Sequence, residues 1–357
     1  MSLVKVYTDL IQFKGTHYEL GYEQAQELKD SMIMKNRRAQ WSKRRKRQFF
    51  TNHDEAVQLL NQFAPGLTAE IQGLADGFEW SFEQAIREFS GYYLEEERSG
   101  CSIMTGTDFL VRNYDSHPSS YEGRLVVYQP TDGGYASIGP SMQITGRMDG
   151  MNEKGFAMGY NFTNRIGSDD GFVCNMIGRM LLENCATVDE GIALLKEVPH
   201  RSSFSYVLFD LKGDSVVVEA SPRTVVVRPA NMCTNHFELL DHENRYQSDE
   251  SIERLNKIKS QWRPSLSISK AYQTLNSREK GIFSDRYSVW SGTLHTSLYQ
   301  PENLMALYGI GADQMPVQYK LGEFLKGEKS RIKRITGRLK NDTPFINEPQ
   351  VAQPKKN

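Results

Sequence analysis

The stretch SGCSIMT (residues 99–105), with FLVRNYD (residues 109–115) shortly after it, marks the point at which the character of this chain changes. Before it, apolar residues recur at three- and four-residue spacing, as in THYELGYEQAQELKDSMIM (residues 16–34), which predicts helices. From Cys101 onward, short β-branched or aromatic runs separated by turn residues predict strands. Residues 1–100 are therefore predicted to form a helical layer that precedes a β-rich region.

The predicted elements combine into an α+β fold. Antiparallel hairpins are expected from the runs CSIMT, FLVRNY, RLVVYQ, FAMGY, FSYVLFD, SVVVEA and TVVVRP. Residues 172–196 are predicted to form two helices, the second capped by Thr187, and residues 250–275 return to helical spacing. A strand block with a helical insert is more typical of a layered α+β fold than of alternating βαβ units. The Pro-bearing tail, residues 341–357, is expected to be loosely ordered.

The charge balance excludes a whole-molecule field that would attract nucleic acid or anionic membranes. The chain has 43 basic and 44 acidic residues, and its net charge is −1. A basic run, Lys43-Arg44-Arg45-Lys46-Arg47, is interpreted as the solvated face of a helix. Neither nucleic acid nor a membrane is predicted as a partner.

The four cysteines of this 357-residue chain lack the dense spacing of a secreted disulfide scaffold, which indicates free thiols in a reducing compartment. No basic region followed by an apolar run opens the chain, and no apolar stretch approaches the roughly 18 residues of a membrane span. These features predict a soluble, cytoplasmic protein. Walker A, GxSxG and HExxH motifs are absent from the sequence, so no cofactor or metal is implied.

The Gly100–Cys101 bond lies at the boundary between the helical and β-rich regions. If it were cut, the freed α-amine, with a pKa of about 7.7 to 8.0, would sit on the residue whose thiol has a pKa of about 8.5. That amine is able to take the thiol proton, so one residue supplies nucleophile and base. The thiol is also suited to attack the carbonyl of Gly100, which has no side chain to obstruct it. A buried structural cysteine is the alternative interpretation.

Arg112 and Asp115 follow on the next strand-like run, and a hairpin would bring both beside Cys101. A carboxylate there is suited to anchor a new ammonium group, and an arginine to hold a thiolate or a substrate. An ordinary surface arginine and aspartate at a turn is the alternative.

Four segments in order, SGC-SIM, VRNYD, GMNEKGFAMGYNF and MCTNHF, resemble the penicillin acyltransferase precursors of the N-terminal-nucleophile superfamily, which also includes choloylglycine hydrolases and penicillin V acylases. The resemblance extends from about residue 15 to residue 310 and is sharpest between Cys101 and Phe237. It implies a four-layer αββα sandwich as the fold.

The resemblance also implies a set of catalytic residues. Cys101 would be the nucleophile, with Arg112 and Asp115 as its nearest supports. Asn235 would give its side-chain amide to the oxyanion hole, and Asn161 would contribute a backbone N–H or its side chain. Relatives carry a later arginine in a Ser-x-x-Arg context, for which Ser251-Ile252-Glu253-Arg254 is the nearest match, so the sixth residue is Arg254.

The resulting hypothesis divides the chain into three parts. Residues 1–100 are a helical segment retained as a small subunit after self-cleavage, residues 101–315 the αββα catalytic domain, and residues 316–357 a partly disordered C-terminal extension. The enzyme would act on linear N-acyl amides through an acyl-thioester on Cys101, released to water or to an amine. The expected partners are a small-molecule amide, an acyl thioester as donor and a second copy of the chain.

Two rival hypotheses stay open at this point. One is an unprocessed, non-catalytic relative that serves as a binding or scaffold protein. The other is a papain-like hydrolase in which His236 is paired with Cys101 and oriented by Asn235. A metal site at Cys233, His236 and His242 lacks the fourth ligand that structural zinc usually has.

Overall fold

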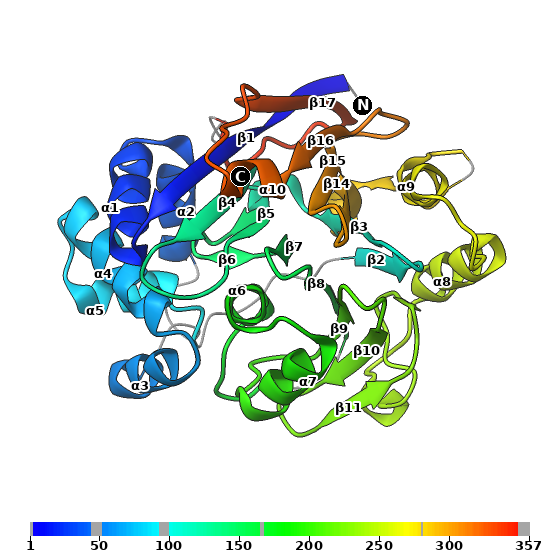
Figure 1. Ribbon diagram of the computed structural model, residues 1–357, viewed down its shortest axis with the longest axis horizontal. Helices are drawn as coiled ribbons and strands as arrows, with labels where there is room; N and C mark the ends of the chain where they lie inside the picture. Colours follow the sequence, from blue (N-terminus) through cyan, green and yellow to red (C-terminus); the bar gives the residue numbers. More distant parts are fainter. Residues whose placement is uncertain (1–2, 44–51, 93–99, 165–167, 280, 349–357) are drawn as a thin grey trace, which may run out of the picture.

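The computed structural model describes residues 3–43, 52–92, 100–164, 168–279 and 281–348, with the side chains of 40–43 excepted. Two β-sheets form its centre, and helices cover their outer sides (Figure 1). Within the described ranges, no helix is long and apolar enough to cross a membrane.

The larger sheet has ten strands in the order β11-β10-β9-β8-β7-β5-β4-β1-β17, with β6 beside β5. Neighbours pair antiparallel except β1 and β4, which are parallel. The strand bounds are β1 Leu3–Gly15, β4 Arg124–Pro130, β5 Ser137–Met142, β6 Gly146–Arg147, β7 Asp149–Asn152, β8 Ala157–Phe162, β9 Phe204–Phe209, β10 Ser215–Ala220, β11 Val225–Arg228 and β17 Arg334–Lys340.

The smaller sheet has seven strands in the order β12-β2-β3-β14-β15-β16, with β13 beside β14. Its central hairpin is made by the two runs that open the β-rich region, because the turn at residues 106–109 folds β3 back antiparallel onto β2. The bounds are β2 Gly100–Thr105, β3 Leu110–Ser116, β12 Met232–Cys233, β13 Asp285–Arg286, β14 Ser291–Gln300, β15 Met305–Gly309 and β16 Val317–Lys320.

The two sheets pack face to face. Gly159 of β8 faces the smaller sheet, where a Cβ at this glycine would lie 3.0 Å from side-chain atoms of Arg112 and Ile103. Apolar residues from both sheets fill the space between them, among them Leu294, Ala157 and Val207. One hydrophobic core of the fold therefore lies between the sheets.

Helices complete the outer layers. The larger sheet is covered by α6 (Cys174–Asn184) and α7 (Val188–Glu197), which share one hydrophobic cluster with β8, β9 and β10. The smaller sheet is covered by α8 (Asp249–Gln261) and α9 (Ile268–Asn276). This arrangement confirms the predicted α+β fold with αββα layers, and Thr187 caps α7 as predicted by accepting from the N–H of Glu190.

The first five helices gather on the side of the molecule opposite α8 and α9 (Figure 1) and extend the cluster around α6. They are α1 His17–Leu28, α2 Met32–Lys43, α3 His53–Phe63, α4 Pro65–Phe78 and α5 Phe82–Phe89. The remaining helix, α10 (Leu321–Leu325), is short. Most of the basic run at residues 43–47 lies outside the described residues.

The structure corrects two expectations at the ends of the chain. Residues 3–15 were predicted as part of a helical layer, yet they form β1, because alternate residues such as Val6 and Leu10 point into the core. Residues 316–357 were expected to be an extension outside the catalytic domain, yet β16 and β17 belong to the two sheets, and Phe345 is buried. Residues 349–357 of the tail lie outside the described residues.

Candidate active site

The β2–β3 hairpin places the junction residues and their predicted supports side by side. Gly100 pairs with Asp115, Cys101 with Tyr114, and Ile103 with Arg112. Side chains alternate between the two faces of a strand. The Cys101 side chain therefore points toward the larger sheet with Arg112, whereas Gly100 and Asp115 lie on the face under α8.

The Cys101 thiol is buried and has two polar neighbours. The guanidinium of Arg112 donates from Nη2 to Sγ at 3.3 Å, and Sγ lies 3.9 Å from the backbone oxygen of Asp115. Burial raises the pKa of the Cys101 thiol, because a thiolate loses solvation there, while the charge of Arg112 opposes the increase. In the intact chain the group is therefore a thiol beside a cation that would stabilise its thiolate.

Arg112 is fixed by contacts that the sequence did not reveal. Its Nη1 donates to Oδ2 of Asp149 at 2.7 Å, and its Nη2 also donates to the backbone oxygen of Tyr160 at 2.6 Å. Both side chains of the ion pair are fully buried. Burial alone would lower the pKa of Arg112, but the neighbouring Cys101 and Asp149 raise it, so the guanidinium stays charged.

Asp149 is the centre of a second group of contacts. Ser297 and Tyr299 donate to its Oδ1 at 2.8 and 2.5 Å, and His295 Nε2 lies 3.5 Å from Oδ2. Burial acts to raise the pKa of Asp149, but His295 and Arg112 outweigh it, and the pKa is lowered well below its usual range. Asp149 is therefore an ionised carboxylate that orients Arg112 toward the sulfur.

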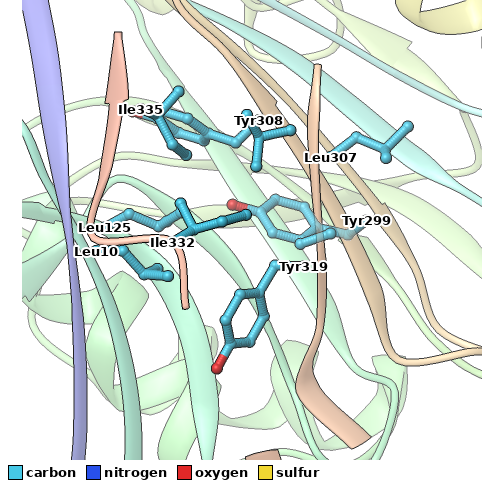
Figure 2. Close-up of a pocket in the computed structure, with 10 residues that line it drawn as sticks. Leu10, Leu125, Tyr299, Leu307, Tyr308, Tyr319, Ile332 and Ile335 are labelled. Atoms are coloured by element: carbon cyan, nitrogen blue, oxygen red, sulfur yellow. The ribbon is translucent and has the colours of Figure 1, made fainter. Parts of the chain in front are cut away.

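Tyr299 also lines an apolar cavity with residues such as Leu10, Leu125 and Ile335 (Figure 2). Cys101 is not among the residues that line it. Tyr299 therefore forms part of the cavity wall while its hydroxyl donates to Asp149, and the residues that line the cavity do not include the nucleophile.

Asp115 carries a buried carboxylate with neither oxygen hydrogen-bonded within the part of the chain that the structure describes. Burial raises the pKa of Asp115 to about 7, with the charge of Arg254 and the facing Thr293 opposing the increase. The carboxylate lies beside Gly100, whose own Cβ position would be 3.5 Å from the Cβ of Asp115. The site therefore holds, next to the Gly100–Cys101 bond, a buried acid whose oxygens have no hydrogen-bond partner among the described residues.

Helix α8 holds the backbone of Cys101 from the other side. Arg254 Nη1 donates to the Cys101 carbonyl at 2.5 Å and to Ser102 Oγ at 2.7 Å, and Nη2 donates to Asn235 Oδ1 at 2.7 Å. Asn235 Oδ1 also accepts the Cys101 N–H at 2.8 Å. One turn earlier on α8, Ser251 Oγ accepts the N–H of Asn235 at 2.8 Å, so this helix fixes both the asparagine and the cysteine backbone.

The amide groups of the two asparagines are occupied by protein acceptors. Asn235 Nδ2 donates to the Phe162 carbonyl at 2.9 Å, and Asn161 Nδ2 donates to the Cys233 carbonyl at 3.0 Å. The structure thus brings both residues to the same region as Cys101 without directing their N–H groups at the sulfur. Their oxyanion roles stay predictions, as do the catalytic roles of the other named residues.

His236 lies away from the thiol contacts. Its Nδ1 is 2.9 Å from Ser251 Oγ, and burial lowers its pKa. Cys233 contacts Asn161 instead, and His242 is exposed. Among the described residues, no group of three or more His, Cys, Asp or Glu side chains is arranged to hold a metal ion.

Comparison with known families identifies the chain. The family model described as acyl-coenzyme A:6-aminopenicillanic acid acyl-transferase matches residues 103–314, more than half of the sequence. The chain belongs to this family. It is accordingly an enzyme that hydrolyses or transfers amide-linked acyl groups, and the resemblance found in the sequence is confirmed. No curated protein matches the chain.

Several solved structures are also similar to it. Penicillin V acylase from Agrobacterium tumefaciens has 16% identity and a TM-score of 0.45, covering 63% of this chain and 86% of its own. A variant of conjugated bile acid hydrolase from Clostridium perfringens has 13% identity and a TM-score of 0.42, and the match covers 72% of this chain and 100% of the hydrolase. The N-acylethanolamine-hydrolyzing acid amidase ortholog of Caenorhabditis elegans has 12% identity and a TM-score of 0.41, and the match covers 57% of this chain and 92% of the amidase.

Proposed function

We propose that this chain is the precursor of a cysteine N-terminal-nucleophile enzyme that cuts itself between Gly100 and Cys101 and then cleaves or transfers linear N-acyl amides. One observation carries the proposal: the thiol of Cys101 is 3.3 Å from a buried arginine, and the preceding glycine faces a buried carboxylate that has no hydrogen-bond partner among the described residues. A purely structural cysteine needs none of these neighbours.

Self-cleavage begins with attack of the Cys101 sulfur on the carbonyl carbon of Gly100. The S–C bond forms, the C–N bond to Cys101 breaks, and the thiol proton moves to the departing nitrogen. Water then opens the thioester, giving a Gly100 carboxylate and a free thiol and amine on Cys101. Glycine suits this position because a Cβ there would lie 3.0 Å from Ser291 Oγ, closer than ordinary contact.

Asp115 gives a physical reason for the reaction to proceed in one direction. An ionised carboxylate without a partner is costly in a buried site. The new α-ammonium group of Cys101 would arise beside it and supply the missing counter-charge. The proposed cleavage therefore relieves an unfavourable feature of the precursor.

In turnover, the α-amine takes the thiol proton and the thiolate attacks the substrate carbonyl. Arg112, held by Asp149, stabilises the thiolate before attack. The amine nitrogen of Cys101 then returns the proton to the leaving amine, and an acyl-thioester remains. Water resolves it in hydrolysis, and an acceptor amine resolves it in acyl transfer.

Asn235 and Asn161 are the proposed donors to the tetrahedral oxyanion. Loss of one oxyanion donor typically costs about 10²- to 10³-fold in rate. For this role their N–H groups must exchange the Phe162 and Cys233 carbonyls for the substrate oxygen. Asn235 is well placed to do so, since its Oδ1 is already fixed by Arg254.

Residues 1–100 would remain bound after cleavage as a small subunit. Strand β1 lies between β4 and β17, so it is an integral part of the larger sheet. Buried ion pairs add to this, because Arg179 of α6 bonds Glu70 of α4 at 2.8 Å. A cytoplasmic location, an acyl thioester as donor and a homo-oligomer remain predictions.

Intact-mass measurement of the purified protein tests the proposal. Two pieces that meet at Gly100/Cys101 are expected from the natural sequence, and one inactive chain from Cys101→Ala. A natural chain that stays whole refutes self-cleavage. If it stays whole yet cleaves amides and loses that activity in His236→Ala, the papain-like mechanism is correct instead, and a whole, inactive chain favours the binding or scaffold protein.

A further inference from the structure

Four buried polar side chains form a compact group on the inner face of the larger sheet, here named the β8–β9 polar block. Its members are Asn161, Thr163, Ser203 and Ser205, each exposed by 2% or less. The oxygen atoms Asn161 Oδ1, Thr163 Oγ1, Ser203 Oγ and Ser205 Oγ have no hydrogen-bond partner among the residues that the structure describes. Buried polar atoms are nearly always paired, so four orphans at one place need an explanation.

The sheet register shows that these side chains share one face. Asn161 pairs with Ser205 across β8 and β9, and the N–H of Thr163 donates to the Ser203 carbonyl one rung further along. Directly opposed side chains have Cβ atoms about 4.5–5.5 Å apart. The block therefore consists of two opposed pairs of polar side chains that follow one another on one face of the sheet.

The block adjoins the nucleophile. Gly159, two residues before Asn161 on the same face, is the point where Arg112 packs against β8. Asn161 contacts Cys233, and Asn235 donates to the carbonyl of Phe162, which lies between Asn161 and Thr163 in the chain. The four unpaired oxygens therefore lie next to the residues that surround the Cys101 sulfur.

We propose that the β8–β9 polar block is the subsite for the amine half of the substrate, and that this half is an uncharged amine bearing hydroxyl or carbonyl groups. The inference rests on the proposed function. There, the Cys101 nitrogen must deliver a proton to the leaving amine, so that amine has to lie on the nitrogen side of the sulfur. The Cys101 nitrogen donates to the side chain of Asn235. The side chain of Asn235 in turn donates to the backbone carbonyl of Phe162, next to Asn161 of the block.

The charges around the block select against a carboxylate in the amine half. Glu219 of β10 is the neighbour of Ser205 on the far side of β9, and it is fully buried. Its carboxylate already accepts hydrogen bonds from the backbone N–H groups of residues 238–240 and forms an ion pair with Arg228. A second anion beside this buried carboxylate would be repelled by its charge, whereas hydroxyl and carbonyl groups match the side chains of the block.

Two amides that share the same acyl chain test the subsite: the octanoyl amide of 2-aminoethanol and the octanoyl amide of propylamine. The two are similar in size, and only the first carries a hydroxyl group. We expect the processed enzyme to favour the hydroxyl amide by about tenfold or more in kcat/KM, as one well-made hydrogen bond allows. In the double variant Thr163→Val/Ser205→Ala, the ratio of the two kcat/KM values should fall to a value between about one and about three. The matched control is Ser137→Ala, another buried serine with an unpartnered hydroxyl, on β5 away from the block, and it should keep the natural ratio.

A binding measurement separates this inference from the proposed function. Calorimetry with Cys101→Ala reads the preference for the hydroxyl amide without chemistry. Preferential binding by that variant, together with no turnover by the natural protein, would support the subsite and refute the proposed function. Turnover of both amides at equal kcat/KM would refute the subsite alone, as would a double variant that keeps the natural ratio.

Discussion

The buried carboxylate of Asp115 makes the precursor's stability depend on pH in an unusual direction. Burial raises the pKa of this carboxyl from 3.8 to about 7. Between these values the unfolded chain loses a proton that the folded chain keeps, so unfolding becomes easier as the pH rises. Because each pKa unit is worth about 1.4 kcal/mol, the folded Cys101→Ala precursor should lose up to about 4 kcal/mol from this group between pH 4 and pH 7.

Urea unfolding of Cys101→Ala with and without Asp115→Asn, at several pH values from 4.5 to 8, measures this loss. The free energy of unfolding should fall with pH more steeply in Cys101→Ala than in the double variant. Asp149→Asn in the same background is the control. Its carboxyl has a lowered pKa, so its contribution is already complete above pH 4 and disappears only at lower pH. Equal pH slopes with and without Asp115 would refute the reasoning.

Three further outcomes follow from the contacts. Asp149→Asn should lower the free energy of unfolding by about 3–5 kcal/mol, measured in urea, because it leaves the buried guanidinium of Arg112 without its counter-ion. Arg254→Leu should cost about 1–3 kcal/mol for each buried acceptor left unpaired, and it should slow self-cleavage in a time course on denaturing gels. For His17, burial acts to lower the pKa, but the hydrogen bond and charge of Glu183 raise it. Its stabilisation is complete below the ordinary pKa and is lost above the raised one, so hydrogen exchange of α1, corrected for intrinsic rates, should lose protection as the pH rises, and Glu183→Gln should remove this dependence.

The hairpin could be predicted from sequence because all its information is local. Two β-rich runs and a short turn fix β2 against β3, and this alone brings Arg112 and Asp115 to Cys101. Asp149 could not be found in this way, since it reaches Arg112 only through packing of one sheet on the other. Strand β1 was missed for a related reason: its alternating pattern is present, but its partners lie at residues 124–130 and 334–340.

The position of Cys101 explains how one chain is able to carry out the proposed cut without losing its fold. Cys101 is the second residue of β2, and the residues that follow it, up to Thr105, pair with β3 on one side. On the other side, Arg254 and Asn235 hold the backbone of Cys101. Breaking the Gly100–Cys101 bond leaves these contacts in place and changes only the orientation of the N–H of Cys101. The thiol is held separately, by Arg112 and Asp149 from the opposite face. Because the two supports act on different atoms of the same residue, the amine can become free to move a proton while the sulfur stays in place.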